Sequence, residues 1–161
     1  MTNFVKLTSM ARSTEALPRA TAFATLRFFG DRLDPDRITA ILGVQPTRAH
    51  RKGERYLAGP RAGHVTGRTG VWVLASDSVV DGAQLDRHLE HVANLIFGHP
   101  DREERLKQLR ELMSRHGIKA DVSCFWRGGP GTRPPSVPEN VIRTFRELPA
   151  EIETDFEVNE D

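Results

Sequence analysis

Basic side chains gather in one stretch of the chain, residues 47–68, and they are the groups best suited to bind or transform a ligand. Six arginines and lysines and two histidines lie there with a single acid, Glu54: Arg48, His50, Arg51, Lys52, Arg55, Arg61, His64 and Arg68. Guanidinium groups match the oxygens of phosphate and carboxylate, and the four glycines of the stretch leave backbone amides accessible. The pattern indicates an anion-binding loop, or else a solvated loop that neutralises acidic segments elsewhere.

Two functions fit this loop. The first is a small non-enzymatic module that holds a protein partner or an anionic ligand, and the absence of a recognisable acid/base pair favours it. The alternative is an enzyme acting on a phosphorylated or carboxylated small molecule, with His50 or His64 as acid/base and arginines as clamps. A glycine-rich turn at residues 128–131 adds Arg127 if it lies beside the loop. The candidate ligand-binding residues are Arg48, His50, Arg51, Lys52, Arg55, His64 and Arg127.

Other reactive residue types have simpler interpretations. His88 and His91 have the spacing of a helical metal pair, but no third ligand is apparent, and a surface or boundary position is the better interpretation. Cys124 has apolar and aromatic neighbours, which favours a buried structural thiol over a nucleophile. The sequence holds no Walker loop, nucleophile elbow or dinucleotide fingerprint. We therefore assign no catalytic residue and expect neither a metal nor a cofactor.

Composition sets the class of protein. The chain has 161 residues, is 38% hydrophobic and 28% charged, and carries a net charge of +1, which is typical of a soluble globular protein. No apolar run is long enough to span a bilayer, so we expect a cytoplasmic protein with no membrane partner. The seven acids and no bases of residues 147–161 balance the basic loop. Only Tyr56 interleaves with the basic residues, which makes a nucleic-acid partner unlikely.

Periodicity and capping signals outline the elements. We expect strands at residues 23–30, 70–76 and 120–126, and a last strand at 151–158 that alternates apolar with acidic residues. Asp34 and Pro35 begin a helix that Gly43 ends at residue 42. Two central helical segments, around Leu89 and Leu109, form a hairpin or one kinked helix. A capping box of Ser136 and Glu139 predicts a last helix.

This order of elements predicts an α+β fold. Two β-α-β units, joined by a helical hairpin insert, would form a ferredoxin-like arrangement with a mixed or antiparallel sheet and helices mainly on one face. We expect a flexible N-terminal lead-in at residues 1–20, a single domain at 21–158 and an acidic tail at 159–161. Homodimerisation through an edge strand is a further expectation.

Several short spaced motifs are similar to those of a known family. They are Leu33-Asp34-Pro35-Asp36 with Ile38, Leu42-Gly43-Val44-Gln45-Pro46-Thr47, Lys52-Gly53-Glu54, Trp72, Ser123-Cys124, Gly128-Gly129 and Pro138-Glu139. In these motifs the chain resembles the bacterial domain of unknown function 4279 family, over about residues 23–158. Because that family has no established activity, the resemblance implies no catalytic residues and no ligand.

Overall fold

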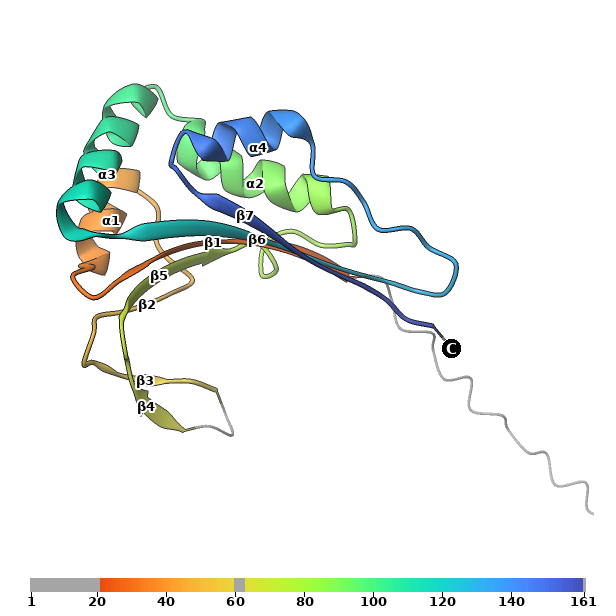
Figure 1. Ribbon diagram of the computed structural model, residues 1–161, viewed down its shortest axis with the longest axis horizontal. Coiled ribbons are helices and arrows are strands. Elements are labelled where there is room, and N and C mark those ends of the chain that lie inside the picture. Colours follow the sequence, from red (N-terminus) through yellow and green to blue (C-terminus); the bar gives the residue numbers. More distant parts are fainter. Residues whose placement is uncertain (1–20, 60–62, 161) are drawn as a thin grey trace, which may run out of the picture.

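A five-stranded mixed sheet organises the molecule, with helices on one face and a two-stranded arm on the other side (Figure 1). The computed structural model describes residues 21–59 and 63–160. The strands are β1 (Thr21–Gly30), β2 (Arg48–His50), β3 (Arg55–Leu57), β4 (His64–Thr66), β5 (Gly70–Ala75), β6 (Lys119–Gly128) and β7 (Glu151–Val158). The helices are α1 (Pro35–Leu42), α2 (Leu85–Phe97), α3 (Arg102–His116) and α4 (Glu139–Arg146).

The strand order in the sheet is β2-β5-β1-β6-β7. The central strand β1 pairs antiparallel with β5 and with β6, while β6 and β7 run parallel. The parallel pair is connected through α4, which is the crossover that parallel neighbours require. The prediction of an α+β fold with a mixed sheet is confirmed.

The ferredoxin-like arrangement is not confirmed. A β-α-β unit of β1, α1 and β5 was expected, but β1 and β5 are antiparallel neighbours. The strand that runs parallel to β1 after α1 is β2, which lies at the sheet edge beyond β5. Because β2 has only three residues within a basic stretch, no alternation marks it in the sequence.

Local signals explain α1 well. Asp34 caps the helix by accepting a hydrogen bond from the backbone N–H of Asp36, Pro35 opens it, and Gly43 ends it with a φ of 66°. Ile38 and Leu42 are buried against the sheet. The indole Nε1 of Trp72 on β5 donates to the Thr39 hydroxyl at 3.0 Å, which joins α1 to the sheet.

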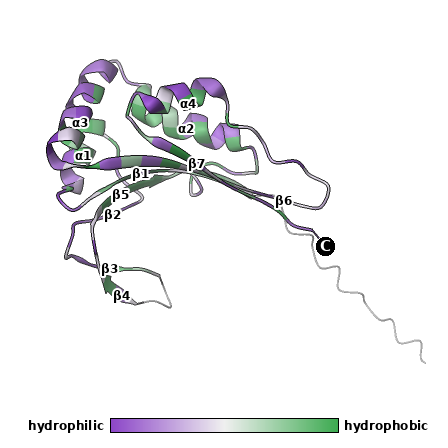
Figure 2. Cartoon of the chain, in the orientation of Figure 1, coloured by the Kyte–Doolittle hydropathy of each residue, from purple (hydrophilic) through white to green (hydrophobic). Residues whose placement is uncertain are grey.

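The helices pack in two pairs over one face of the sheet. Helix α1 contacts α3, and α2 contacts α4, so the two central helices are separate and do not pack as a hairpin. Buried apolar residues of all four helices belong to one core cluster with residues of the sheet, and Figure 2 shows hydrophobic segments in green along α2 and the strands below it. The largest fully buried side chains here include Phe28, Trp72, Leu89, Leu109 and Phe145. One core cluster therefore covers the helical face of the sheet.

The start of α4 differs from the prediction. Pro138, rather than Ser136, occupies the N-cap of α4, and no side chain caps that helix, so the predicted capping box is wrong. The loop before α4 is rich in proline, which fixes an extended approach to the helix.

The predicted lead-in at residues 1–20 lies outside the described residues. In the described part of the chain, no helix combines the length and apolar character needed to cross a membrane.

Candidate functional site

Part of the basic stretch forms an arm, which we define as residues 53–59 and 63–67, including β3 and β4. Figure 1 shows the arm extending from the β2 and β5 end of the sheet, on the side away from the helices. Hydrogen bonds at its base join Gly53 N to Gly67 O at 2.8 Å and Gly67 N to Glu54 O at 2.7 Å. The sequence analysis assigned this stretch to a loop, because its strands have three residues each and are paired only with each other.

Arg51 and Lys52 hold the base of the arm to the body of the protein. The Arg51 guanidinium donates to Asp34 at 2.7 Å, to Asp36 at 2.6 Å and to Glu54 at 3.2 Å. These carboxylates raise the pKa of Arg51, with the hydrogen bond to Asp36 the largest cause. Lys52 donates to Asp31 at 2.6 Å. Both cations already have acidic partners, so their positions indicate a structural role.

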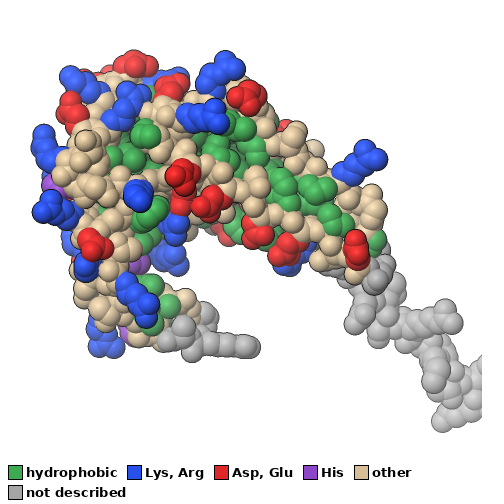
Figure 3. Space-filling model, in the orientation of Figure 1, with side chains coloured by type: hydrophobic (Ala, Val, Ile, Leu, Met, Phe, Trp, Pro, Cys, Tyr) green, Lys and Arg blue, Asp and Glu red, His purple; other side chains and the backbone are tan. Residues whose placement is uncertain are grey.

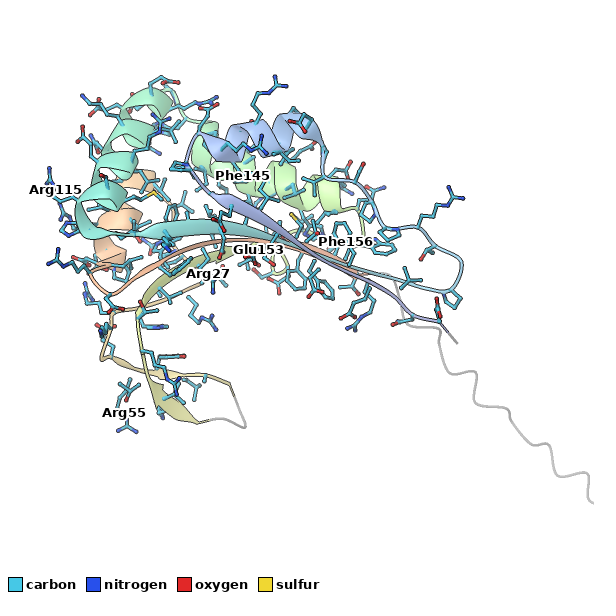
Figure 4. The ribbon with its side chains drawn as sticks, in the orientation of Figure 1. Arg27, Arg55, Arg115, Phe145, Glu153 and Phe156 are labelled. Atoms are coloured by element: carbon cyan, nitrogen blue, oxygen red, sulfur yellow. The ribbon has the colours of Figure 1, made fainter. Side chains whose placement is uncertain are left out.

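A groove of about 640 Å³ lies between the arm and the open face of the sheet. We call it the basic groove, and its polar lining is Arg27, Arg48, His50, Tyr56, Thr66, Arg68 and Thr69. Arg27 comes from β1 and Arg48 and His50 from β2, while the other four belong to the arm or directly follow it. Figure 4 shows Arg27 on the sheet face that the arm approaches.

The three arginines of the basic groove differ in their partners. Arg27 forms an ion pair with Asp121 on β6, through Nε to Oδ1 at 3.2 Å and through a second contact between Nη2 and Oδ2. That hydrogen bonding is the largest cause of the raised pKa of Arg27. Among the described residues, neither Arg48 nor Arg68 has a carboxylate oxygen within 4.0 Å. Two guanidinium groups in one groove are therefore without a counter-charge from the described chain.

His50 is the buried polar residue of the groove. Its residue surface is 6% exposed, and its ring stacks on Tyr56 of the arm with centroids 4.1 Å apart. Gly67 makes this packing feasible, since an added Cβ would lie 2.6 Å from Cδ2 of His50. The ring nitrogen Nδ1 is buried and has no hydrogen-bond partner among the described residues. A buried nitrogen without a partner is uncommon, and a catalytic role or a bound water or ion are among the explanations for one.

The remaining predicted residues lie outside the basic groove. Arg55 and His64 are exposed on the arm, and Arg55 points away from the sheet in Figure 4. Arg127 lies at the C-terminal end of β6, the end far from the arm. There its Nε donates to Glu157 at 2.7 Å and its guanidinium stacks on Phe125. The structure therefore brings together Arg48 and His50 from the predicted set. It does not bring Arg127 to the arm.

Arg27 and Arg68 line the groove although neither is among the candidate residues predicted from the sequence. Arg27 is separated from the basic stretch in sequence and reaches the groove only because β1 pairs with β5. One signal was available: in the alternation of β1, an arginine shares the solvent side with Thr25 while Leu26 and Phe28 are buried. Arg68 lies two residues after the end of β4, so its position depended on the unrecognised arm.

The other reactive residues are structural. His88 is buried, so its predicted surface or boundary position is wrong; its Nε2 bonds to the Gly82 carbonyl at 3.0 Å and its Nδ1 to the Ser76 hydroxyl at 2.8 Å. No group of three or more potential metal ligands occurs within residues 21–59 and 63–160. Burial raises the pKa of the Cys124 thiol to about 11, which disfavours a nucleophilic role.

These features define an α+β protein whose mixed sheet has helices on one face and an arm that encloses a basic groove on the other. The chain belongs to the family described as Domain of unknown function (DUF4279), whose model matches residues 19–159. The resemblance seen in its spaced motifs is thus confirmed. No curated protein and no solved structure matches the chain.

Proposed function

We propose that the protein is a non-enzymatic binding module that holds an anionic ligand in the basic groove. One observation supports this most directly: Arg48 and Arg68 line the same groove without a carboxylate near either guanidinium. Elsewhere in the same segment, Arg51 and Lys52 have acidic partners. The chain supplies counter-charges at the base of the arm, and an external anion would supply them in the groove.

The expected ligand carries phosphate or carboxylate oxygens. Arginine donates two parallel hydrogen bonds to such groups, and a hydrogen bond to a charged group contributes about 1.5–3 kcal/mol. Thr66 and Thr69 add hydroxyl groups to the lining, and Tyr56 adds an aromatic ring. The volume of about 640 Å³ falls within the range of about 300–1,000 Å³ typical of small-molecule sites. A small organic anion therefore fits the groove better than a macromolecular surface.

The test is isothermal titration calorimetry, in which the full chain is titrated with pyrophosphate and with citrate at low ionic strength. The double variant Arg48→Ala/Arg68→Ala should bind at least about tenfold more weakly, since two charge-assisted contacts are lost. Its control is Arg55→Ala/Arg115→Ala, which removes the same charge from exposed positions outside the groove. We expect the control to stay within about twofold of the original protein, because only long-range attraction is reduced.

Equal weakening in both double variants would show a general charge effect and would overturn the proposal. Failure of the original protein to bind either anion saturably would overturn it as well. The circular dichroism spectrum of each variant checks that the fold is retained.

An enzyme is the second candidate, and His50 is the observation that favours it. The unpartnered Nδ1 of His50 lies in a groove lined by arginines, as an acid/base acting on a phosphorylated or carboxylated substrate would. Since Nδ1 is buried, a substrate would reach it only after the side chains packed around His50 had moved. Hydrolysis of phosphate monoesters by the protein, lost in His50→Gln but retained in His64→Gln, would favour this function over simple binding.

A further inference from the structure

The outer edge of β7 is unpaired in the described part of the chain. β7 stands at the end of the strand order and pairs only with β6, along all eight of its residues. The amide of Asn159, the next residue, donates to the Gly128 carbonyl of β6 at 2.9 Å. Backbone groups alternate in direction along a strand, so the amides of Thr154 and Phe156 point away from β6. An exposed row of donors and acceptors of this kind can pair with another strand.

On the helical side of this edge lies an apolar groove of about 690 Å³, which we call the edge groove. Its apolar lining comes from β7, from α4 and from the loop before α4: Pro135, Val137, Ile142, Ala150, Ile152 and Phe156. Ile152, Phe156 and Val137 are only partly buried against the core. Figure 3 shows hydrophobic side chains gathered along this side of the molecule, next to the acidic row described below.

On the open side of the same edge lies a row of acids. Glu151, Glu153, Asp155 and Glu157 alternate with the residues that face the helices. Glu157 forms an ion pair with Arg127. Among the described residues, no basic nitrogen lies within 4.0 Å of the carboxylates of Glu151, Glu153 or Asp155. The edge is thus mainly apolar on the helical side, where Arg146 and Glu151 also line the groove, and negatively charged on the open side.

We propose that a separate extended peptide segment, with apolar and basic residues in alternation, adds to β7 as a sixth strand of the sheet. Side chains of a strand point alternately to the two faces. An alternating segment would place its apolar side chains in the edge groove and its basic side chains beside Glu153 and Asp155. Backbone hydrogen bonds would give affinity, and the two faces would give specificity.

A second copy of this chain fits the edge poorly. Two β7 edges would bring two rows of acids side by side, and like charges on neighbouring strands are destabilising. The opposite sheet edge, β2, has only three residues and cannot cover the eight of β7. This docking surface uses other strands than the proposed contacts of Arg48 and Arg68 in the basic groove, and it carries the opposite sign of charge.

The first test uses charge inversion. An eight-residue peptide in which valine and lysine alternate is titrated into the full chain, alongside the matched peptide in which glutamate replaces lysine. Glu151→Lys/Asp155→Lys should bind the lysine peptide at least about tenfold more weakly and should gain affinity for the glutamate peptide. The control Glu104→Lys/Glu111→Lys makes the same charge change on exposed positions of α3. An equal effect in the control would overturn the proposal.

The second test concerns the backbone. Hydrogen exchange should slow at Thr154 and Phe156 when the lysine peptide binds, since their outward amides gain partners. Thr154→Pro removes one outward amide at an exposed edge position, where proline is tolerated, and Thr154→Ala retains it. We expect the proline variant to lose at least about tenfold in affinity and the alanine variant to bind like the original protein. If the proline variant fails to fold, the charge-inversion variant and the hydrogen-exchange measurement still test whether the peptide pairs with β7.

Hydrogen exchange at Thr154 and Phe156 in the free protein shows whether something else already covers the edge of β7. Protection of these amides that grows with protein concentration would show a second copy at the edge. Protection that is independent of concentration would show that the chain covers its own edge. Either result, or binding of both peptides without protection, would overturn the proposal of a separate basic segment.

Discussion

Arginines of the same short segment differ in their contacts because their neighbours differ. Arg51 donates to three carboxylates, two of which belong to the start of α1 and one to the arm itself. Arg48, three residues earlier, lies on the solvent side of β2 and faces the basic groove. Arg48 on β2 is therefore a candidate ligand-binding residue, whereas Arg51, in the turn after β2, contacts the start of α1 and the base of the arm.

The pH dependence of stability should reveal the contacts at the base of the arm. Hydrogen bonds from the Arg51 backbone N–H and side chain lower the pKa of Glu54 below its ordinary value of 4.5. A lowered folded pKa means that the carboxylate contributes stability above pH 4.5 and loses it as the pH falls through the folded value. Glu54→Gln should thus lower the melting temperature at about pH 7 and have a smaller effect at about pH 3.

Thermal unfolding at both pH values measures this difference. Glu90→Gln, which removes an exposed carboxylate on α2 that forms no ion pair with any described residue, is the control and should change the melting temperature little at either pH. A decrease caused by Glu54→Gln that is as large in acid as at neutral pH would contradict the assignment.

At the scale of elements, a close approach of backbones fixes how the chain enters β5. Gly70 begins β5, and an added Cβ there would lie 2.8 Å from the Gly30 carbonyl oxygen and 2.9 Å from the Leu33 carbonyl oxygen. Both contacts are to backbone atoms, which cannot move aside as a side chain can. The turn after β1 and the return of the chain from the arm therefore need glycine at this position.

Gly70→Ala should destabilise the protein by about 1–3 kcal/mol, the usual cost of overpacking a closely packed site. Urea denaturation measures the free energy of unfolding. Gly129→Ala is the matched control, because nothing lies within 4 Å of a Cβ at that position, and it should change stability by less than about 0.5 kcal/mol. Similar stability in the two variants would show that the backbone around Gly70 adjusts.

At the scale of the whole molecule, one hydrophobic cluster includes side chains of β1, β5, β6 and all four helices. The two tryptophans lie at different places in it: Trp72 packs against Phe28 and bonds to α1, and Trp126 packs edge-on against Phe156 of β7. A shared core of this kind indicates that both helix pairs unfold together.

Unfolding should therefore be a single cooperative transition. In Trp72→Phe and in Trp126→Phe, the remaining tryptophan reports on one part of the core. We expect the urea midpoint from its fluorescence to coincide with the midpoint from far-ultraviolet circular dichroism in each variant, as two-state behaviour requires. Separate midpoints within one variant would show two unfolding units and would contradict the single domain expected at residues 21–158.

Short-range signals in the sequence determined much of the scaffold. The cap at Asp34, the glycine at position 43 and the apolar spacing of α1 act within a few residues, and the helix has the predicted bounds. The alternation of β7 is likewise local, and its bounds are also as predicted. Gly117 ends α3 with a φ of 63°, directly after a last turn that contains Arg115 and His116.

Only the tertiary structure decided which charged residues share a site. The sequence placed positive charge in residues 47–68, and the fold pairs Arg51 and Lys52 with acids around α1, outside the lining of the basic groove. Strand pairing brought Arg27 to the groove and left Arg127 at the far end of β6. Caps and periodicity depend on near neighbours, whereas ion pairs such as Arg27–Asp121 join residues far apart in sequence, and these contacts exist only once the sheet has formed.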